Sequence, residues 1–175
     1  MLSGEFSVTL DDTGRIVFPR KLRDILDTGR LKLTKGADSC LWLFMPEQWG
    51  VFEKDLLERT EHFSARGRRQ RQHFIGGMQA VDLDNHGRIL IPPTLRDYAG
   101  LSKECVVFGQ VDYIEIWDQA NYKAYLEASD DDFKAGLEEI GAMIRHERES
   151  GQYGYSAHSG AAGGDDTVSR SEREE

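Results

Sequence analysis

Two copies of one short turn carry the residues whose types and spacing could bind nucleic acid. Each copy has the form Asp-x-x-Gly-Arg: Asp11, Gly14 and Arg15 in the first, and Asp84, Gly87 and Arg88 in the second. In such a turn the Asp side chain accepts hydrogen bonds from the backbone ahead of it, and the glycine supplies a positive φ. The arginine then leaves the turn in a fixed pose, and its planar fork fits phosphate oxygens or the O6/N7 edge of guanine. The turns therefore predict a DNA reader in which arginine contacts DNA and aspartate orients the loop.

Further polar side chains extend this predicted DNA face. They are Thr13, His86, Arg20, Lys21, Arg68 and Arg69. Clustered lysine and arginine supply phosphate contacts, which give affinity and register without sequence information. For the cluster 66–71 a second interpretation stays open, namely a solubilising face or pairing with acidic helices of a neighbouring subunit. Arg23 and Arg96 lie in identical Leu-Arg-Asp triplets, and we expect them to pair within the molecule rather than with DNA.

A lone arginine at the start of a strand is by default a solvated residue or a partner of a nearby carboxylate. Arg15 and Arg88 each follow an aspartate by four positions, so a purely structural role as its ion-pair partner is the default interpretation for both. The recurrence of the same arrangement in two copies is what favours a functional role.

The sequence contains no pattern typical of an enzyme or a metal site. Its five histidines form no His-Glu-x-x-His pair, and no serine lies in a Gly-x-Ser-x-Gly elbow. Cys40 and Cys105 form no Cys-x-x-Cys pair and are expected in the core. No Gly-x-Gly-x-x-Gly or Gly-Lys-Ser/Thr loop follows the turns. We therefore predict no catalysis, no cofactor, no metal and no small-molecule substrate.

Charge is distributed unevenly along the 175 residues, whose net charge is −9. Residues 1–110 hold 16 Lys/Arg and 15 Asp/Glu, whereas residues 111–175 hold 6 and 16. The acidity is thus concentrated in the C-terminal third, and a nucleic-acid partner for the rest is not excluded. No apolar run approaches the ~18 residues of a membrane span, and residues 1–5 do not begin a signal peptide. We expect no membrane association and a cytoplasmic location.

The two turns belong to a tandem duplication. A shift of 73 residues lays residues 8–24 over residues 81–97 without a gap, and 10 of these 17 positions are identical. The copies differ beside the turns, because Pro93 and Thr94 stand where the first copy has Arg20 and Lys21. The second half-site is therefore expected to be poorer in positive charge.

Both copies predict the same succession of elements. An alternating apolar stretch forms a strand, the turn leads into a second strand, and a proline then opens a short helix. The second strands are expected over 15–18 and 88–91, the short helices over 20–26 and 93–99, further strands over 31–34, 40–44, 104–108 and 113–117, and longer helices over 46–61 and 118–128.

DDTGRIVFPRKLRD and DNHGRILIPPTLRD resemble the paired signatures of the MraZ family of bacterial transcriptional regulators, relatives of AbrB-like swapped-hairpin DNA-binding domains. The resemblance covers about residues 1–145 and includes VDYIEIWD at 111–118. It implies an α+β fold in which two pseudo-symmetric AbrB-like βαβ halves interleave into one small swapped-hairpin β-barrel with flanking helices.

The same resemblance implies a homo-oligomeric ring that binds short repeated boxes in double-stranded promoter DNA. Such a protein is expected at the nucleoid, usually as a repressor of its own division and cell-wall gene cluster. The alternative is an AbrB-like antitoxin or protein–protein interaction module, whose tail would bind a toxin.

These expectations divide the chain into five parts. Residues 1–62 are the first repeat, 63–75 a basic connecting segment, 76–129 the second repeat, 130–150 a C-terminal helix, and 151–175 an acidic tail expected to be disordered.

Overall fold

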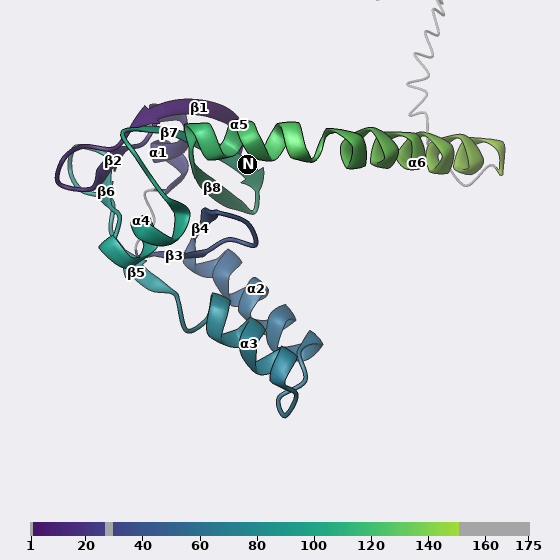
Figure 1. Ribbon diagram of the computed structural model, residues 1–175, viewed down its shortest axis with the longest axis horizontal. Coiled ribbons are helices and arrows are strands. Elements are labelled where there is room, and N and C mark those ends of the chain that lie inside the picture. Colours follow the sequence, from purple (N-terminus) through teal and green to yellow (C-terminus); the bar gives the residue numbers. More distant parts are fainter. Residues whose placement is uncertain (1, 27–29, 151–175) are drawn as a thin grey trace, which may run out of the picture. The chain divides into compact units, whose positions relative to one another are not determined.

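Figure 1 shows the computed structural model of the chain, which describes residues 2–26 and 30–150. In chain order the elements are β1 (Leu2–Thr9), β2 (Arg15–Val17), α1 (Arg20–Leu26), β3 (Leu31–Lys35), β4 (Cys40–Phe44), α2 (Pro46–Arg59), α3 (Ala65–Phe74), β5 (Gln79–Val81), β6 (Arg88–Leu90), α4 (Pro93–Ala99), β7 (Glu104–Val111), β8 (Tyr113–Asp118), α5 (Gln119–Ala128) and α6 (Asp130–Glu149). Contacts divide the chain into a first unit up to Asp130 and a second unit from Asp131. The tail predicted over 151–175 lies outside the described residues.

The ends of the predicted helices follow from local hydrogen bonds. Helix α2 ends earlier than expected, at Arg59, because Thr60 turns to an extended conformation and its hydroxyl donates to Leu56 O at 2.6 Å. Helix α5 starts one residue later than expected. Asp118 is its N-cap, and the carboxylate accepts from the N–H groups of Ala120 and Asn121.

All strand pairs are antiparallel, and the α+β class is confirmed. Six strands form one sheet in the order β1-β7-β8-β4-β3-β5, while β2 and β6 pair separately as a two-stranded ribbon. The prediction of a closed barrel is wrong, because β1 and β5 are the two free edges of the described sheet. The reason is that the ribbon strands pair with each other, and only the isolated bridges Leu10–Ile16 and Leu83–Ile89 link them to the preceding segments.

The two copies are interleaved in the sheet: the hairpins β3–β4 and β7–β8 each belong to one copy, and the other three strand pairs join different copies. Copy one supplies β1, β3 and β4, which pair with β7, β5 and β8 of copy two. When each strand is replaced by its equivalent from the other copy, the strand order reads the same from the opposite edge of the sheet. Trp42 and Glu115 occupy equivalent positions 73 residues apart and face each other across β4 and β8. The sheet therefore has a pseudo-twofold axis that passes between these two residues.

One core serves both copies. Its fully buried side chains come in equivalent pairs: Ile16 and Ile89, Phe18 and Ile91, Leu22 and Leu95. Burying one such aliphatic side chain contributes about 1.5–3 kcal/mol. Each copy supplies about half of this cluster, so the apolar side chains of one copy are covered by those of the other.

The repeat contains a one-residue shift that the ungapped alignment missed. Leu31 pairs with Val81, whereas Val8, the equivalent of Val81, pairs with Cys105 rather than with Glu104. Cys105 is therefore the structural counterpart of Leu31, and both face the core while Glu104 is exposed. Burial raises the pKa of the Cys105 and Cys40 thiols to about 12, as expected for core cysteines.

Candidate nucleic-acid interface

The first turn is organised by the carboxylate of Asp11. Its Oδ1 accepts from the backbone N–H of Thr13 and of Arg15, both at 2.9 Å, and from the Thr13 hydroxyl at 2.6 Å. A backbone hydrogen bond from Gly14 to Asp11 O closes the turn. The Arg15 guanidinium donates to Thr13 Oγ1 at 2.6 Å and forms no ion pair within the described part of the chain. Arg15 is thus oriented while its charge remains available.

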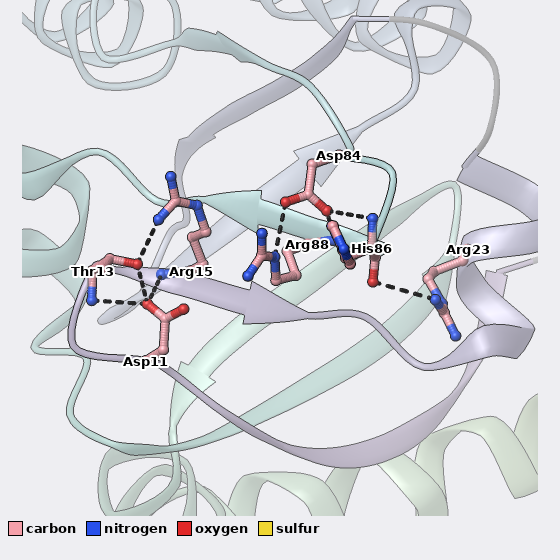
Figure 2. A network of polar contacts seen from close by, with 7 residues as sticks. All are labelled: Asp11, Thr13, Arg15, Arg23, Asp84, His86 and Arg88. Carbon is pink, nitrogen blue, oxygen red and sulfur yellow. Dashed lines mark hydrogen bonds and ion pairs between the residues drawn. The ribbon is translucent and has the colours of Figure 1, made fainter.

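The second turn repeats the backbone pattern with a different side-chain arrangement. Asp84 Oδ1 accepts from the N–H groups of His86 and Arg88 at 2.8 and 3.0 Å. His86 offers no hydroxyl in place of Thr13, and Arg88 Nε instead donates to Asp84 Oδ2 at 2.8 Å. Figure 2 shows this difference between the two turns. The charge of Arg88 is therefore partly compensated, whereas that of Arg15 is not.

These hydrogen bonds favour the ionised form of both aspartates and lower their pKa values. The Thr13 hydroxyl, followed by the Arg15 N–H, lowers the pKa of Asp11 below its ordinary value. Burial acts to raise the pKa of Asp84, but the backbone and side chain of Arg88 together with the His86 N–H lower it to about 2. Both carboxylates accept the hydrogen bonds that close the loops.

Glycine is required in each turn for its backbone conformation. Gly14 has φ +82° and Gly87 has φ +72°, a region that residues with a Cβ rarely adopt. The carbonyl of each glycine then accepts from the other copy: Phe18 N donates to Gly87 O and Ile91 N to Gly14 O, both at 2.9 Å. The turns of the two copies are thus tied to each other through the ribbon.

The ribbon presents four side chains on its outer face. Arg15 lies opposite Leu90, and Val17 lies opposite Arg88. Val17 and Leu90 are about half exposed, at 50% and 48%, whereas the intervening isoleucines are fully buried. Sequence reasoning missed these two aliphatic residues, although strict alternation with the buried isoleucines would have placed them outward. The four side chains therefore form one outward-facing patch, with the two arginines at diagonally opposite corners and the two aliphatic side chains at the other two.

Arg23 and Arg96 lie against the turns, each on the turn of the opposite copy. A Cβ on Gly14 would lie 2.6 Å from Arg96 Nη1, and a Cβ on Gly87 would overlap the Arg23 side chain. Arg23 Nη1 also donates to His86 O at 3.5 Å (Figure 2). Their contacts are intramolecular, as expected, but the partner is a turn 63 or more residues away rather than a neighbouring carboxylate.

The remaining predicted cations occupy two different places. Arg20 and Lys21 are exposed in the first turn of α1, directly after the ribbon strand β2. Arg68 and Arg69 are exposed on α3. The C-terminal end of α3 is held at the β3–β4 hairpin, where Thr34 Oγ1 donates to Phe74 O, and in Figure 1 the helix points away from the ribbon. The structure therefore brings Arg20 and Lys21 near the second turn, where Phe18 N donates to Gly87 O, but it does not bring Arg68 and Arg69 there.

Arg71, on the same helix, has a structural role that the sequence did not reveal. Its guanidinium donates to Thr60 Oγ1 at 2.8 Å, to Thr60 O at 2.6 Å and to Leu57 O at 3.1 Å. These bonds satisfy carbonyls at the C-terminal end of α2, where a cation is favoured.

Two classes of feature were not found among the described residues. Over 2–26 and 30–150, histidine, cysteine and carboxylate side chains form no group of three that could hold a metal ion. In the same ranges, no helix has both the length and the apolar composition needed to cross a membrane.

Comparison with known proteins gives consistent matches over most of the chain. The family described as "MraZ protein, putative antitoxin-like" matches residues 1–71 and 74–140. The "Transcriptional regulator MraZ" of Treponema pallidum (strain Nichols) is 42% identical over 138 residues, which are 79% of this chain and 93% of the relative. The protein of the same name from Treponema denticola is 37% identical over 142 residues, 81% of this chain and 99% of the relative. In Moorella thermoacetica the corresponding values are 36% over 141 residues, 80% and 96%.

Among solved structures, the solution structure of PHS018 from Pyrococcus horikoshii matches 66% of this chain and 88% of its own. Its sequence identity is 16% and its TM-score 0.30, too low to support any conclusion about this chain.

Proposed function

Because this chain belongs to the MraZ family, we propose that it is a transcriptional regulator that binds double-stranded promoter DNA in a sequence-specific manner. Both the family match and the relatives' name support the regulatory role. The observation that carries the DNA-binding part is the outer face of the β2–β6 ribbon, with Arg15 and Arg88 held at its two ends by the aspartate-centred turns.

A two-stranded ribbon fits the width of the major groove, where base pairs can be distinguished by their edges. In this arrangement Arg15 and Arg88 contact guanine O6 and N7 with two hydrogen bonds each. Val17 and Leu90, which are half exposed between them, contact thymine methyl groups. Thr13 and His86 lie in the turns and line the rim of the same contact.

The exposed cations at the start of α1 supply sequence-independent affinity. Arg20 and Lys21 follow the ribbon directly and contact the phosphates beside the groove. The equivalent positions of α4, which packs against the first turn, are Pro93 and Thr94. The pair of cations therefore lies beside the second turn, at which Phe18 N donates to Gly87 O, and the expectation that the second half-site is poorer in positive charge is wrong.

A single subunit makes few contacts with DNA, and we propose that a homo-oligomeric ring provides the avidity for repeated boxes. The second unit supports self-association, because α6 carries an apolar stripe with no cover among the described residues. Its members, spaced four, three and four residues apart, are Phe133, Leu137, Ile140 and Ile144, with exposed fractions from 38% to 62%. A stripe of this kind is typical of a helix that packs against a partner.

The finer regulatory role is repression of the division and cell-wall gene cluster that includes its own gene, which places the protein at the nucleoid. The alternative is an antitoxin or a protein–protein interaction module, a class that the matching family's description also names. A toxin gene beside its own would favour this alternative, whereas division and cell-wall genes downstream favour the repressor.

Footprinting on the DNA upstream of its own gene tests the proposal. We expect a protected array of short, evenly spaced repeats, hereafter the boxes, and lower transcription from that promoter when the protein is added. Absence of protection at low salt would overturn the proposal, since phosphate contacts are strongest there.

A further inference from the structure

Arg23 and Arg96 are two arginines of the first unit whose charged groups lack the usual partners. Both are partly buried, and neither forms an ion pair within the described ranges. The Nε of each is shielded from solvent and has no hydrogen-bond partner. Leaving a polar group buried and unpaired is costly, so the position of each guanidinium needs a compensating reason.

That reason is found at the glycine of the opposite turn. The space in which a Cβ of Gly14 would lie is taken by Arg96, whose Nη1, Cζ and Nε come within 2.6, 2.7 and 3.1 Å of it. The Arg23 side chain takes the corresponding space at Gly87. Each guanidinium thus covers the one residue of the turn that has the widest conformational freedom.

The crossing follows from the antiparallel ribbon. Strand β6 ends beside the first turn, where Ile91 N donates to Gly14 O, and α4 with Arg96 follows at once. By the same geometry β2 ends beside the second turn, and α1 brings Arg23 to it. The helix that follows one reading arginine in the chain is therefore placed against the turn that carries the other reading arginine.

We infer that Arg96 is the positioning residue for the Arg15 reader and Arg23 the positioning residue for the Arg88 reader, so that each half-site is completed by the opposite copy. This inference rests on the proposed DNA-binding function. By covering the glycine, the guanidinium holds the turn in the conformation that aims the reading arginine. Its loss leaves the turn intact but less restricted, which reduces binding to the correct sequence more than binding to DNA in general.

A double-mutant cycle on the full chain tests this assignment. The variants Arg96→Met and Arg23→Met keep the aliphatic stem and remove the guanidinium. Each is combined with Arg15→Ala and with Arg88→Ala, and affinity is measured for a footprinted box and for a scrambled duplex of the same length. Arg20→Met, on the same helix as Arg23, is the matched control.

We expect Arg96→Met to weaken box binding about tenfold in the wild-type and Arg88→Ala backgrounds, and little further in the Arg15→Ala background. Arg23→Met should show the opposite coupling, with Arg88 rather than Arg15. Arg20→Met should be additive with both readers and should weaken box and scrambled duplex alike.

Three results would each overturn the inference. The first is coupling of Arg23 or Arg96 with the reading arginine of its own copy, and the second is additivity with both reading arginines. The third is an equal loss of affinity for the box and for the scrambled duplex, which would make Arg23 and Arg96 phosphate contacts. If the methionine variants melt several degrees lower, the backbone amide resonances decide instead: Arg23→Met must shift Gly87 rather than Gly14. A wild-type protein that does not prefer the box over the scrambled duplex refutes the proposed function itself, and the inference with it.

Discussion

Ile16 and Ile89, which occupy equivalent positions in the two copies, are direct cross-strand partners at the centre of the β2–β6 ribbon, and both are fully buried. A pseudo-twofold axis therefore runs between them, as it does between Trp42 and Glu115 in the sheet. The backbone hydrogen bonds of one turn consequently have counterparts at the other end of the ribbon, although the side-chain contacts of Arg15 and Arg88 differ. In the proposed function, Arg15 and Arg88 are therefore halves of one DNA-binding site rather than two separate sites.

The shared core makes a prediction about the separated halves. Residues 1–72 and 73–150, expressed individually, should be insoluble or should pair with themselves. Each half keeps one hairpin, β3–β4 or β7–β8, but loses every strand partner from the other copy and half of the buried cluster. Circular dichroism and sedimentation analysis measure the outcome. A half that is folded and monomeric would contradict the single interleaved core.

The two reading arginines should differ in importance. Arg15→Ala should cost about 1–3 kcal/mol of box binding, as expected for a bidentate guanine contact, and Arg88→Ala should cost no more than that. The reason is that Arg88 is already paired with Asp84, whereas Arg15 has no carboxylate partner among the described residues. Fluorescence anisotropy with box and scrambled duplexes gives both values.

Thermal melting is the control for these variants, since both side chains lie on the outer face of the ribbon and their loss should spare the fold. Wild-type affinity for the box in both alanine variants would place the DNA face elsewhere.

The parts of the site that the sequence predicted are those built from local interactions. Asp11 and Asp84 bond to groups two and four residues ahead, and such short-range geometry is encoded by residue type and spacing. The short helices α1 and α4 occupy the predicted residues for the same reason, since a proline precedes or opens each one.

The parts that the sequence did not predict depend on long-range packing. The contact of Arg23 with the turn at Gly87 joins residues far apart in the chain, and it follows only from the pairing of β2 with β6. The shift that makes Cys105 the counterpart of Leu31 is likewise decided by which side chain can be buried, because a one-residue slip moves a strand's side chains to the other face. The open sheet, in place of the expected barrel, also follows from these pairings.

Asp84 should titrate well below an ordinary aspartate. Its pKa is lowered to about 2 in the folded protein, against ~3.9 for an unfolded chain. Its contribution to stability is therefore complete above about pH 4 and is lost as the pH falls through about 2. A titration followed by carboxyl carbon NMR measures the midpoint.

Removing the ion pair tests the cause of this shift. Arg88→Met should move the Asp84 midpoint upward but still below the ordinary value, because the backbone N–H groups of residues 86 and 88 remain. A midpoint near 4 in the wild-type protein would show that the turn is not held as described.

The apolar stripe of α6 should determine the oligomeric state of the protein in solution. Replacing Leu137 and Ile140 by aspartate adds charge at the centre of the stripe and should reduce the oligomer to smaller species, since each apolar side chain contributes about 1.5–3 kcal/mol when buried. Light scattering after size-exclusion chromatography gives the mass. The double variant Glu138→Gln, Glu139→Gln is the control on the same helix, and an unchanged mass in the aspartate variant would assign self-association to another surface.

The exposed arginines of α1 and α3 should be separable by their salt dependence. Each phosphate contact contributes about 0.9 to the slope of log affinity against log salt concentration. Arg20→Ala with Lys21→Ala should therefore lower the slope by about 2 for any sequence, since both residues follow the ribbon directly. Arg68→Ala with Arg69→Ala should leave the slope unchanged on a duplex that spans one box, because α3 is held at the β3–β4 hairpin and points away from the ribbon (Figure 1). The measurement is affinity over a salt series for box and scrambled duplexes. An equal loss of slope in the α3 variant would show that the duplex reaches that helix, and the two arginines would then be phosphate contacts as their clustering in the sequence first indicated.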